Sequence, residues 1–153
     1  MVTIAQAVPA GSFTTPFNAT LINLPAFCRV AATLKPSGDS DIKIEVWLPA
    51  VAESRGAWNA KLLAVGNGGW AGSIPYAALA AALRRGYAAS ATDTGHEGAG
   101  GNFALGHPEK LIDYAYRSEH EMTVTARTVV ETFSARAANR STTLAPFSLR
   151  RAR

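Results

Sequence analysis

A glycine cluster is the segment of this chain best suited to chemistry. Gly66-Asn67-Gly68-Gly69-Trp70-Ala71-Gly72 places four glycines in seven positions, directly after the apolar run Leu62 to Val65. Because glycine has no Cβ, the backbone N–H groups of such a loop can face a ligand at close range. The cluster therefore predicts a site for a phosphate or for a negative charge that develops during a reaction.

Three interpretations of this loop stay open from its residues alone. It is a tight strand-to-helix turn, a dinucleotide site that uses Gly66, Gly68 and Asp93, or an oxyanion loop after the third strand of an α/β-hydrolase. Gly69 and Gly72 give no clean G-x-G-x-x-G spacing, and Asp93 comes late for a ribose-binding acid. The spacing therefore disfavours the dinucleotide site.

Polar side chains gather in a second segment, around residues 90–107. Ser90, Asp93 and His96 could suggest a catalytic triad, but Ser90 is expected in mid-strand and the chain has no Gly-x-Ser-x-Gly elbow. His96 and His107 lack the spacing of a metal site. We expect Asp93 and His96 to form hydrogen bonds within their loop, and we expect neither a metal nor a cofactor.

The elements that must position these residues alternate between strands and helices. Phe27 to Leu34 and Ile42 to Leu48 predict an antiparallel hairpin, the second strand half-buried because apolar and polar residues alternate in it. Leu62 to Val65 predicts a strand buried on both faces. Tyr76 to Arg85 predicts a helix that ends before Gly86, and 87–92 a second buried strand.

Helical spacing returns after a glycine-rich loop over 94–107. A short helix is expected over 110–116 and a longer one over 119–137, with an apolar stripe made by Met122, Ala126, Val129, Val130 and Phe133. His120 near its start is expected to be structural. Together these elements predict an α/β domain whose mixed sheet has an antiparallel hairpin followed by parallel strands, with flanking helices.

Composition divides the chain into an extended segment over 1–25, one domain over 26–138 and a basic tail over 139–153. Residues 1–138 carry 11 basic and 11 acidic residues, so the net charge of +4 comes from the tail alone. We expect no nucleic-acid partner, no membrane association and a poorly ordered tail. The first residues lack the pattern of a signal peptide, which predicts a cytoplasmic location for the chain as written.

Six motifs follow one another in a specific order across residues 3–138. They are Leu24-Pro25-Ala26-Phe27-Cys28-Arg29-Val30; Ser40-Asp41-Ile42-Lys43-Ile44-Glu45-Val46-Trp47-Leu48-Pro49; Trp58-Asn59 with Gly66-Asn67-Gly68-Gly69; Arg85-Gly86-Tyr87-Ala88; Thr92-Asp93-Thr94-Gly95-His96; and Tyr116-Arg117 with His120-Glu121-Met122. In this combination they resemble the tannase and feruloyl esterase family, although any one motif alone would be unspecific.

The resemblance implies the N-terminal part of an α/β-hydrolase whose members, often secreted, cleave phenolic-acid esters with a serine nucleophile. It implies that Gly68 and Gly69 belong to the oxyanion loop. The family's Gly-Cys-Ser-x-Gly-Gly nucleophile motif, its Asp and its His-Cys have no counterpart in the 153 residues, so no catalytic residue is assigned. The resemblance also implies that Cys28 matches a family cysteine paired with one upstream of Met1.

These implications make the chain, as written, an inactive fragment of an incomplete fold. A sheet that lacks the nucleophile strand and later strands has an open edge, which is an aggregation hazard.

The tail predicts a frameshift or gene-model error after about Arg140. Where the family continues toward its nucleophile, this chain reads Ser141-Thr142-Thr143-Leu144-Ala145. Sequencing the coding DNA is expected to reveal, in another frame, a Gly-Cys-Ser codon run and a downstream Asp and His-Cys. An alternate frame without them would contradict the hypothesis.

Overall fold

The computed structural model describes residues 1–50 and 58–140. Its centre is a five-stranded sheet in the order β1-β4-β5-β7-β6, formed by β1 (Val2–Val8), β4 (Phe27–Leu34), β5 (Ile42–Pro49), β7 (Ala88–Thr92) and β6 (Leu62–Val65). β1, β4, β5 and β7 pair antiparallel, whereas β6 and β7 pair parallel. The predicted hairpin and the mixed sheet are confirmed.

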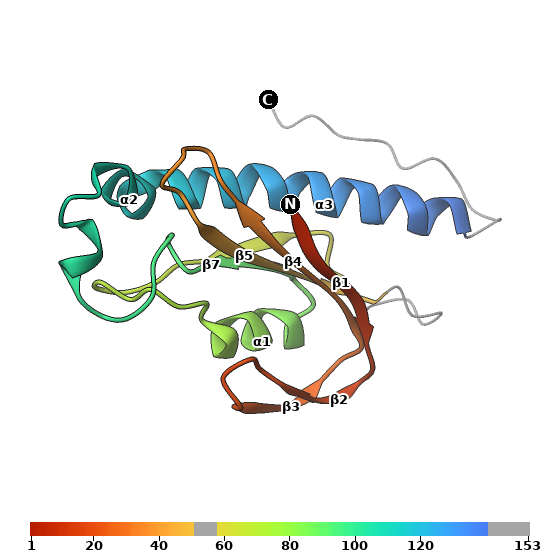
Figure 1. Cartoon of the computed structure of the whole chain (residues 1–153). Helices are drawn as coiled ribbons and strands as arrows, with labels where there is room; N and C mark the ends of the chain where they lie inside the picture. Colours follow the sequence, from red (N-terminus) through yellow and green to blue (C-terminus); the bar gives the residue numbers. More distant parts are fainter. Residues whose placement is uncertain (51–57, 141–153) are drawn as a thin grey trace.

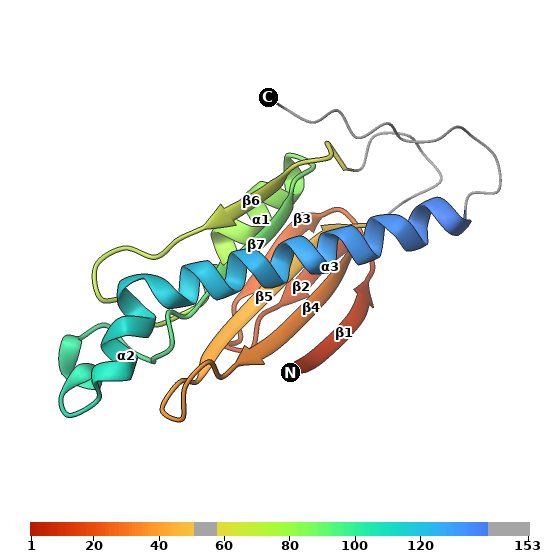
Figure 2. The ribbon, with the colours of Figure 1, turned by 90° about the horizontal axis from the view of Figure 1, so that it is seen from above.

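Helices cover both faces of this sheet. α3 (Ser118–Arg140) runs along one face, while α1 (Tyr76–Arg84) and the small sheet of β2 (Gly11–Thr14) and β3 (Thr20–Leu24) lie on the other (Figures 1 and 2). The Arg84 guanidinium donates to the carbonyls of Ile22 and Asn23, and so joins the end of α1 to β3. Residues 1–25, predicted only as extended, therefore supply one strand of the main sheet and a second layer over α1.

The last helices are more continuous than the sequence predicts. α2 (Pro108–Ile112) passes through one π-helical turn, η2 (Asp113–Arg117), directly into α3, and a 3₁₀ turn, η1 (Gly101–Ala104), interrupts the preceding loop. The predicted stripe of α3 is confirmed, because Met122 and Ala126 are buried against the sheet and Val129, Val130 and Phe133 pack partly buried beside them. His120 is exposed.

Two burial predictions for the strands are wrong. β5 is buried on both faces instead of half-buried, because α1 and the β2–β3 layer cover the face that carries Glu45 and Trp47. β6 is only partly buried, because it pairs with β7 alone among the described residues and forms an edge of the sheet. The expected open edge is therefore β6. Aggregation through it stays a prediction.

The helix α1 ends as its sequence predicts. Gly86 follows it with φ +77°, and the N–H groups of Gly86 and Tyr87 donate to the carbonyls of Leu83 and Ala82. Glycine adopts this left-handed conformation at little cost, so the chain can turn directly into β7.

Cys28 lies on the α3 face of β4. It is half-buried beside Val46 and Leu48, and burial raises the pKa of its thiol. It is the one cysteine of the 153 residues, so it has no partner within them. Of the tail predicted over 139–153, residues 141–153 lie outside the described residues. In the described residues no helix combines the length and the apolar character needed to cross a membrane.

A buried ion pair fixes the α1 face of the sheet. The Glu45 carboxylate, 2% exposed, accepts hydrogen bonds from both ends of the Arg29 guanidinium, from Trp47 Nε1 at 2.7 Å and from Tyr76 Oη at 2.8 Å. Four donors saturate the two oxygens, which offsets the cost of removing both charges from water.

Replacing Glu45 with leucine is expected to lower the free energy of unfolding by about 3–5 kcal/mol, because the Arg29 charge then stays buried without its partner. Denaturant unfolding measures this. Lys35→Met is the matched control, because the ion pair of Lys35 with Asp41 is solvent-exposed and long, at 3.9 Å. The loss of unfolding free energy in this variant should stay within about 0.5 kcal/mol. Equal costs for the two variants would contradict the role given to Glu45.

Candidate oxyanion loop

The glycine cluster lies where two loops meet. β6 and β7 run parallel, so the segment after β6 (residues 66–75) and the segment after β7 (residues 93–107) leave the same end of the sheet. The Gly72 N–H donates to the Gly98 carbonyl at 2.6 Å, which joins the two segments in a short antiparallel bridge. The predicted position of the loop, between a strand and a helix, is confirmed.

Gly72 is required by this junction. A Cβ at Gly72 would lie 2.5 Å from His96 Cδ2 and 2.6 Å from the His96 carbonyl oxygen. His96 is buried, so neither atom has free space to retreat into. Only glycine lets the two segments approach this closely.

Each carbonyl from Gly68 to Ala71 is held by a donor. Ala71 N–H donates to the Gly68 oxygen at 3.3 Å, and Tyr114 Oη donates to the Gly69 oxygen at 2.5 Å. Further along the loop, the Trp70 oxygen is 3.1 Å from His96 Nε2 and the Ala71 oxygen is 3.1 Å from Asn67 Nδ2.

The Asn67 amide also anchors the loop to the sheet. Its Nδ2 donates a second hydrogen bond, of 3.0 Å, to the carbonyl of Thr92 at the end of β7. One side chain thus ties the beginning of the loop both to its end and to the neighbouring strand.

Several N–H groups of the loop, unlike its carbonyls, have no hydrogen-bond partner among the described residues. In residues 1–50 and 58–140, the N–H groups of Gly68, Gly69 and Trp70 donate to no acceptor. Gly68 and Gly69 are exposed, and a Cβ at either would meet no atom within 4 Å. Gly69 has φ +56°, a left-handed conformation that suits glycine. Unpaired N–H groups on an open, pre-shaped loop can hold an anionic oxygen.

Aromatic rings support the loop from its far side. Trp70 stacks on Tyr114 with ring centroids 4.6 Å apart, and His96 stacks on Phe103 at 3.7 Å. Tyr114 comes from η2 and Phe103 from η1, so residues remote in sequence build this support. Neither residue is predicted from the sequence to belong to the site. Their contacts depend on how distant helices pack, and no local pattern signals that.

The residues of the possible triad are not joined. Ser90 is fully buried within β7, and its hydroxyl has no hydrogen-bond partner in the described part of the chain. Asp93 Oδ1 accepts from the N–H groups of Lys43 and Gly95, at 2.9 and 2.8 Å, while His96 contacts Thr94 and Trp70. Asp93 and His96 therefore make hydrogen bonds within their loop, as expected, and each also bonds to another part of the chain, Asp93 to β5 and His96 to the glycine loop.

Burial dominates the ionisation of Asp93. It raises the pKa of this carboxyl to about 6, although the two backbone N–H groups and Lys43 favour the charged form. Burial likewise raises the pKa of Glu119, whose carboxylate lies near the Gly66 position. His107 is exposed and pairs with Asp39 at 2.9 Å, away from the loop junction that His96 supports. Among the described residues no cluster of three His, Cys, Asp or Glu could hold a metal.

Comparisons with known proteins agree on one group of enzymes. The sequence model of the family described as "Tannase and feruloyl esterase" matches residues 28–144. An uncharacterized esterase of Xanthomonas campestris pv. campestris is 42% identical over 135 residues, which cover 87% of this chain and 23% of that protein. A protein named "Probable feruloyl esterase B-1" from Aspergillus fumigatus is 35% identical over 107 residues, 70% of this chain and 19% of its own length.

A solved structure supports the same similarity. The crystal structure of feruloyl esterase B from Aspergillus oryzae superposes with a TM-score of 0.78 at 30% identity, over 86% of this chain and 26% of that one. The chain thus spans about a quarter or less of the length of the relatives it matches. The alternative of a nucleotide site at Gly66, Gly68 and Asp93 receives no support from these relatives.

Alanine substitutions at two loop glycines should show whether the loop needs glycine at Gly72 because a Cβ has no room there. Gly72→Ala is expected to lower the free energy of unfolding by about 1–3 kcal/mol, because its Cβ overlaps the His96 backbone. Gly68→Ala is the matched control, because its Cβ meets nothing and its φ is not positive; we expect a cost within about 1 kcal/mol.

Denaturant unfolding measures the stability cost of each variant. The amide NMR shifts of residues 93–98 show whether the segment that contacts Gly72 is displaced. Unfolding free energies that agree for the two variants would contradict the close junction between the two loops.

Proposed function

Because this chain belongs to the tannase and feruloyl esterase family, we propose that its Gly68–Gly69 segment is the oxyanion loop of a serine carboxylic-ester hydrolase acting on phenolic-acid esters such as feruloyl or galloyl esters. The observation that carries the proposal is the difference in hydrogen bonding between the carbonyls and the N–H groups of the loop. Among the described residues, each carbonyl from Gly68 to Ala71 has a hydrogen-bond partner, whereas the N–H groups of Gly68, Gly69 and Trp70 donate to no acceptor.

The position of the loop fits this role. In α/β-hydrolases one oxyanion donor is the N–H after the nucleophile and another comes from the loop after the third strand. The loop here follows β6, whose outer side is unpaired among the described residues and can accept a neighbouring strand. A nucleophile at the end of that strand would lie beside the Gly68 and Gly69 amides.

During acyl transfer the ester carbonyl oxygen becomes negatively charged. Fixed N–H groups stabilise that charge more than the neutral ester, so they lower the barrier and not merely the energy of the bound substrate. The hydrogen bonds of Asn67, His96 and Tyr114 hold the loop in place before the reaction and limit the reorganisation that it requires.

These 153 residues hold no Gly-x-Ser-x-Gly elbow, so we propose that they alone hydrolyse no ester. The ester substrate belongs to the assembled enzyme, which needs neither a metal nor a cofactor for this chemistry.

A chimera tests the role of the loop. We expect the Xanthomonas esterase to stay active on methyl ferulate when its matching 135 residues are replaced by those of this chain, to which they are 42% identical. In that chimera, Asn67→Ala should lower kcat about ten- to hundredfold with a smaller change in KM, because it loosens groups that act on the transition state.

Asn102→Ala is the matched control, because Asn102 is exposed and its side chain makes no hydrogen bond in the described part of the chain. Thermal unfolding checks that each variant is folded. A folded chimera without activity would overturn the proposal, as would an Asn67→Ala variant with unchanged kcat. The 153-residue chain serves as the blank.

A further inference from the structure

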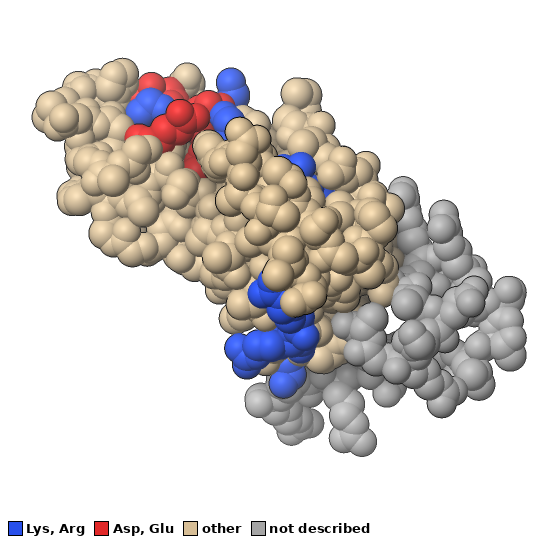
Figure 3. Space-filling view, turned by 90° about the horizontal axis from the view of Figure 1, so that it is seen from below, with Lys and Arg blue, Asp and Glu red and all other residues tan. Residues whose placement is uncertain are grey.

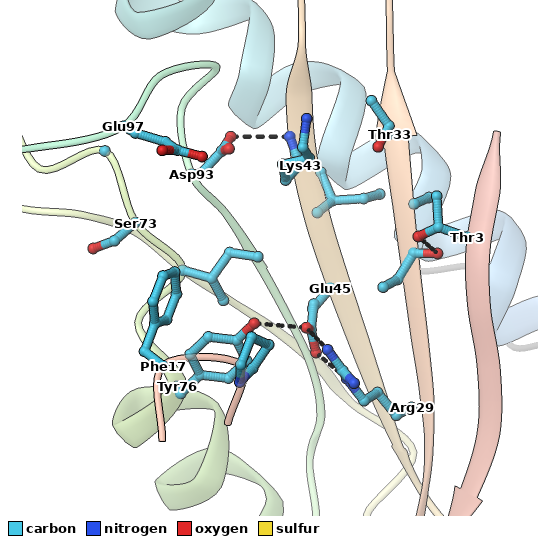
Figure 4. A pocket seen from close by; sticks show the side chains of 16 residues that line it. Thr3, Phe17, Arg29, Thr33, Lys43, Glu45, Ser73, Tyr76, Asp93 and Glu97 are labelled. Carbon is cyan, nitrogen blue, oxygen red and sulfur yellow. Dashed lines mark hydrogen bonds and ion pairs between the residues drawn. The ribbon is translucent and has the colours of Figure 1, made fainter. Parts of the chain in front are cut away.

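A concave site lies between the main sheet and the β2–β3 turn. It is a pocket of about 280 Å³ whose walls come from β1, β4 and β5 on one side and from the turn at Pro16 and Phe17 and residues 72–76 on the other. The residues that matter for its chemistry are Ile74 and five residues labelled in Figure 4: Phe17, Lys43, Glu45, Asp93 and Glu97.

The charged groups on the floor of the pocket already have partners within the protein. Arg29 and Glu45 neutralise each other, and Tyr76 and Trp47 donate to the remaining positions of the Glu45 carboxylate. A ligand that replaced any of these partners would leave a buried polar group unpaired, at a high cost. The floor is therefore structural.

One wall carries two carboxylates whose hydrogen-bonding capacity is only partly used among the described residues. The Lys43 ammonium, the other cation of the lining, is engaged by Asp41 at 2.5 Å. Glu97 makes no ion pair or hydrogen bond among the described residues, and Asp93 uses only Oδ1. Asp93 as a residue is 7% exposed, and its Oδ2, which accepts no hydrogen bond among the described residues, belongs to the side chain that lines the pocket wall. Figure 4 shows the Glu97 side chain pointing toward Asp93, whose carboxylate points toward Lys43, at one end of the pocket.

The opposite wall is apolar and aromatic. The Phe17 ring, 72% exposed, lies 6.4 Å from the Tyr76 ring, and Ile74 continues the surface toward the loop. An exposed aromatic ring beside a pocket is suited to pack against an apolar ligand body. Across this whole face acidic and basic side chains mix at one end and basic ones gather at the other, with neutral surface between them (Figure 3).

We propose that this pocket binds a small organic ammonium ion, with its cation between Asp93 and Glu97 and its apolar body against Phe17 and Ile74. The ammonium would supply donors to Asp93 Oδ2 and to the Glu97 carboxylate, neither of which accepts a hydrogen bond among the described residues. This goes beyond the proposed esterase function, since the Gly68–Gly69 amides recognise an anion and this pocket recognises a cation.

The pocket should bind such a cation more weakly in acid. The charged groups that act on the Asp93 carboxyl are Lys43 in β5 and Asp41 just before it. Glu97 of its own loop points toward Asp93 in Figure 4. Burial raises the pKa of Asp93 to about 6, so the carboxylate that attracts the ligand is lost as the pH falls through that value. Affinity should therefore be greater at pH 7.5 than at pH 5.

Calorimetric titration of the 153-residue chain with benzylammonium chloride tests the proposal, with benzyl alcohol as the neutral probe of the same shape. We expect binding of the ammonium alone, and a loss of affinity of about tenfold or more in Asp93→Asn and in Glu97→Gln. Asparagine retains the Oδ1 acceptor that Lys43 and Gly95 use, and Glu97 is exposed, so both variants should fold.

Glu131→Gln is the control, because Glu131 is exposed on α3, across the sheet from the pocket. It should leave the affinity unchanged. Three results would overturn the proposal: no binding of benzylammonium at pH 7.5, equal binding of benzyl alcohol, or a loss in Glu131→Gln equal to that in the pocket variants. The last would show general charge attraction only.

Discussion

The Glu45 carboxylate is the constraint on which the packing of the α1 face depends. It is a buried charge that must keep all of its donors, and those donors come from β4, β5 and the first turn of α1. Meeting that demand fixes where α1 begins against the sheet. The segment between β6 and α1 then has a set start and a set end, and this span contains the glycine cluster.

The pattern of the sequence predicts the elements better than their surroundings. Alternation in Ile42 to Leu48 and the apolar run Leu62 to Val65 both identify strands correctly. Their burial is reversed, because burial depends on what lies above and beside a strand. Glu45 and Trp47 are polar or amphipathic residues that a second layer covers, while β6 is apolar at an edge. Periodicity reports the faces of a strand but not the number of its neighbours.

The candidate site divides in the same way. Its glycines are visible in the sequence, and two have a structural reason: Gly69 has a left-handed backbone that favours glycine, and Gly72 contacts His96 too closely for a Cβ. The side chains that shape the loop are not visible. Tyr114 lies 45 positions from Gly69, and its role depends on the π-helical turn that joins α2 to α3, which the spacing of apolar residues does not reveal.

The contacts that shape this loop lie within the described residues. Asn67, His96 and Tyr114 contact the carbonyls, and Gly98 accepts from Gly72, so groups of this chain hold the loop that carries the Gly68, Gly69 and Trp70 amides. A donor array held by its own surroundings loses little freedom when charge develops beside it, which is the condition for electrostatic catalysis. Under the proposed role as an oxyanion loop, the rest of the enzyme would need to bring the nucleophile to a loop that is already formed. The loop would not have to fold around the nucleophile.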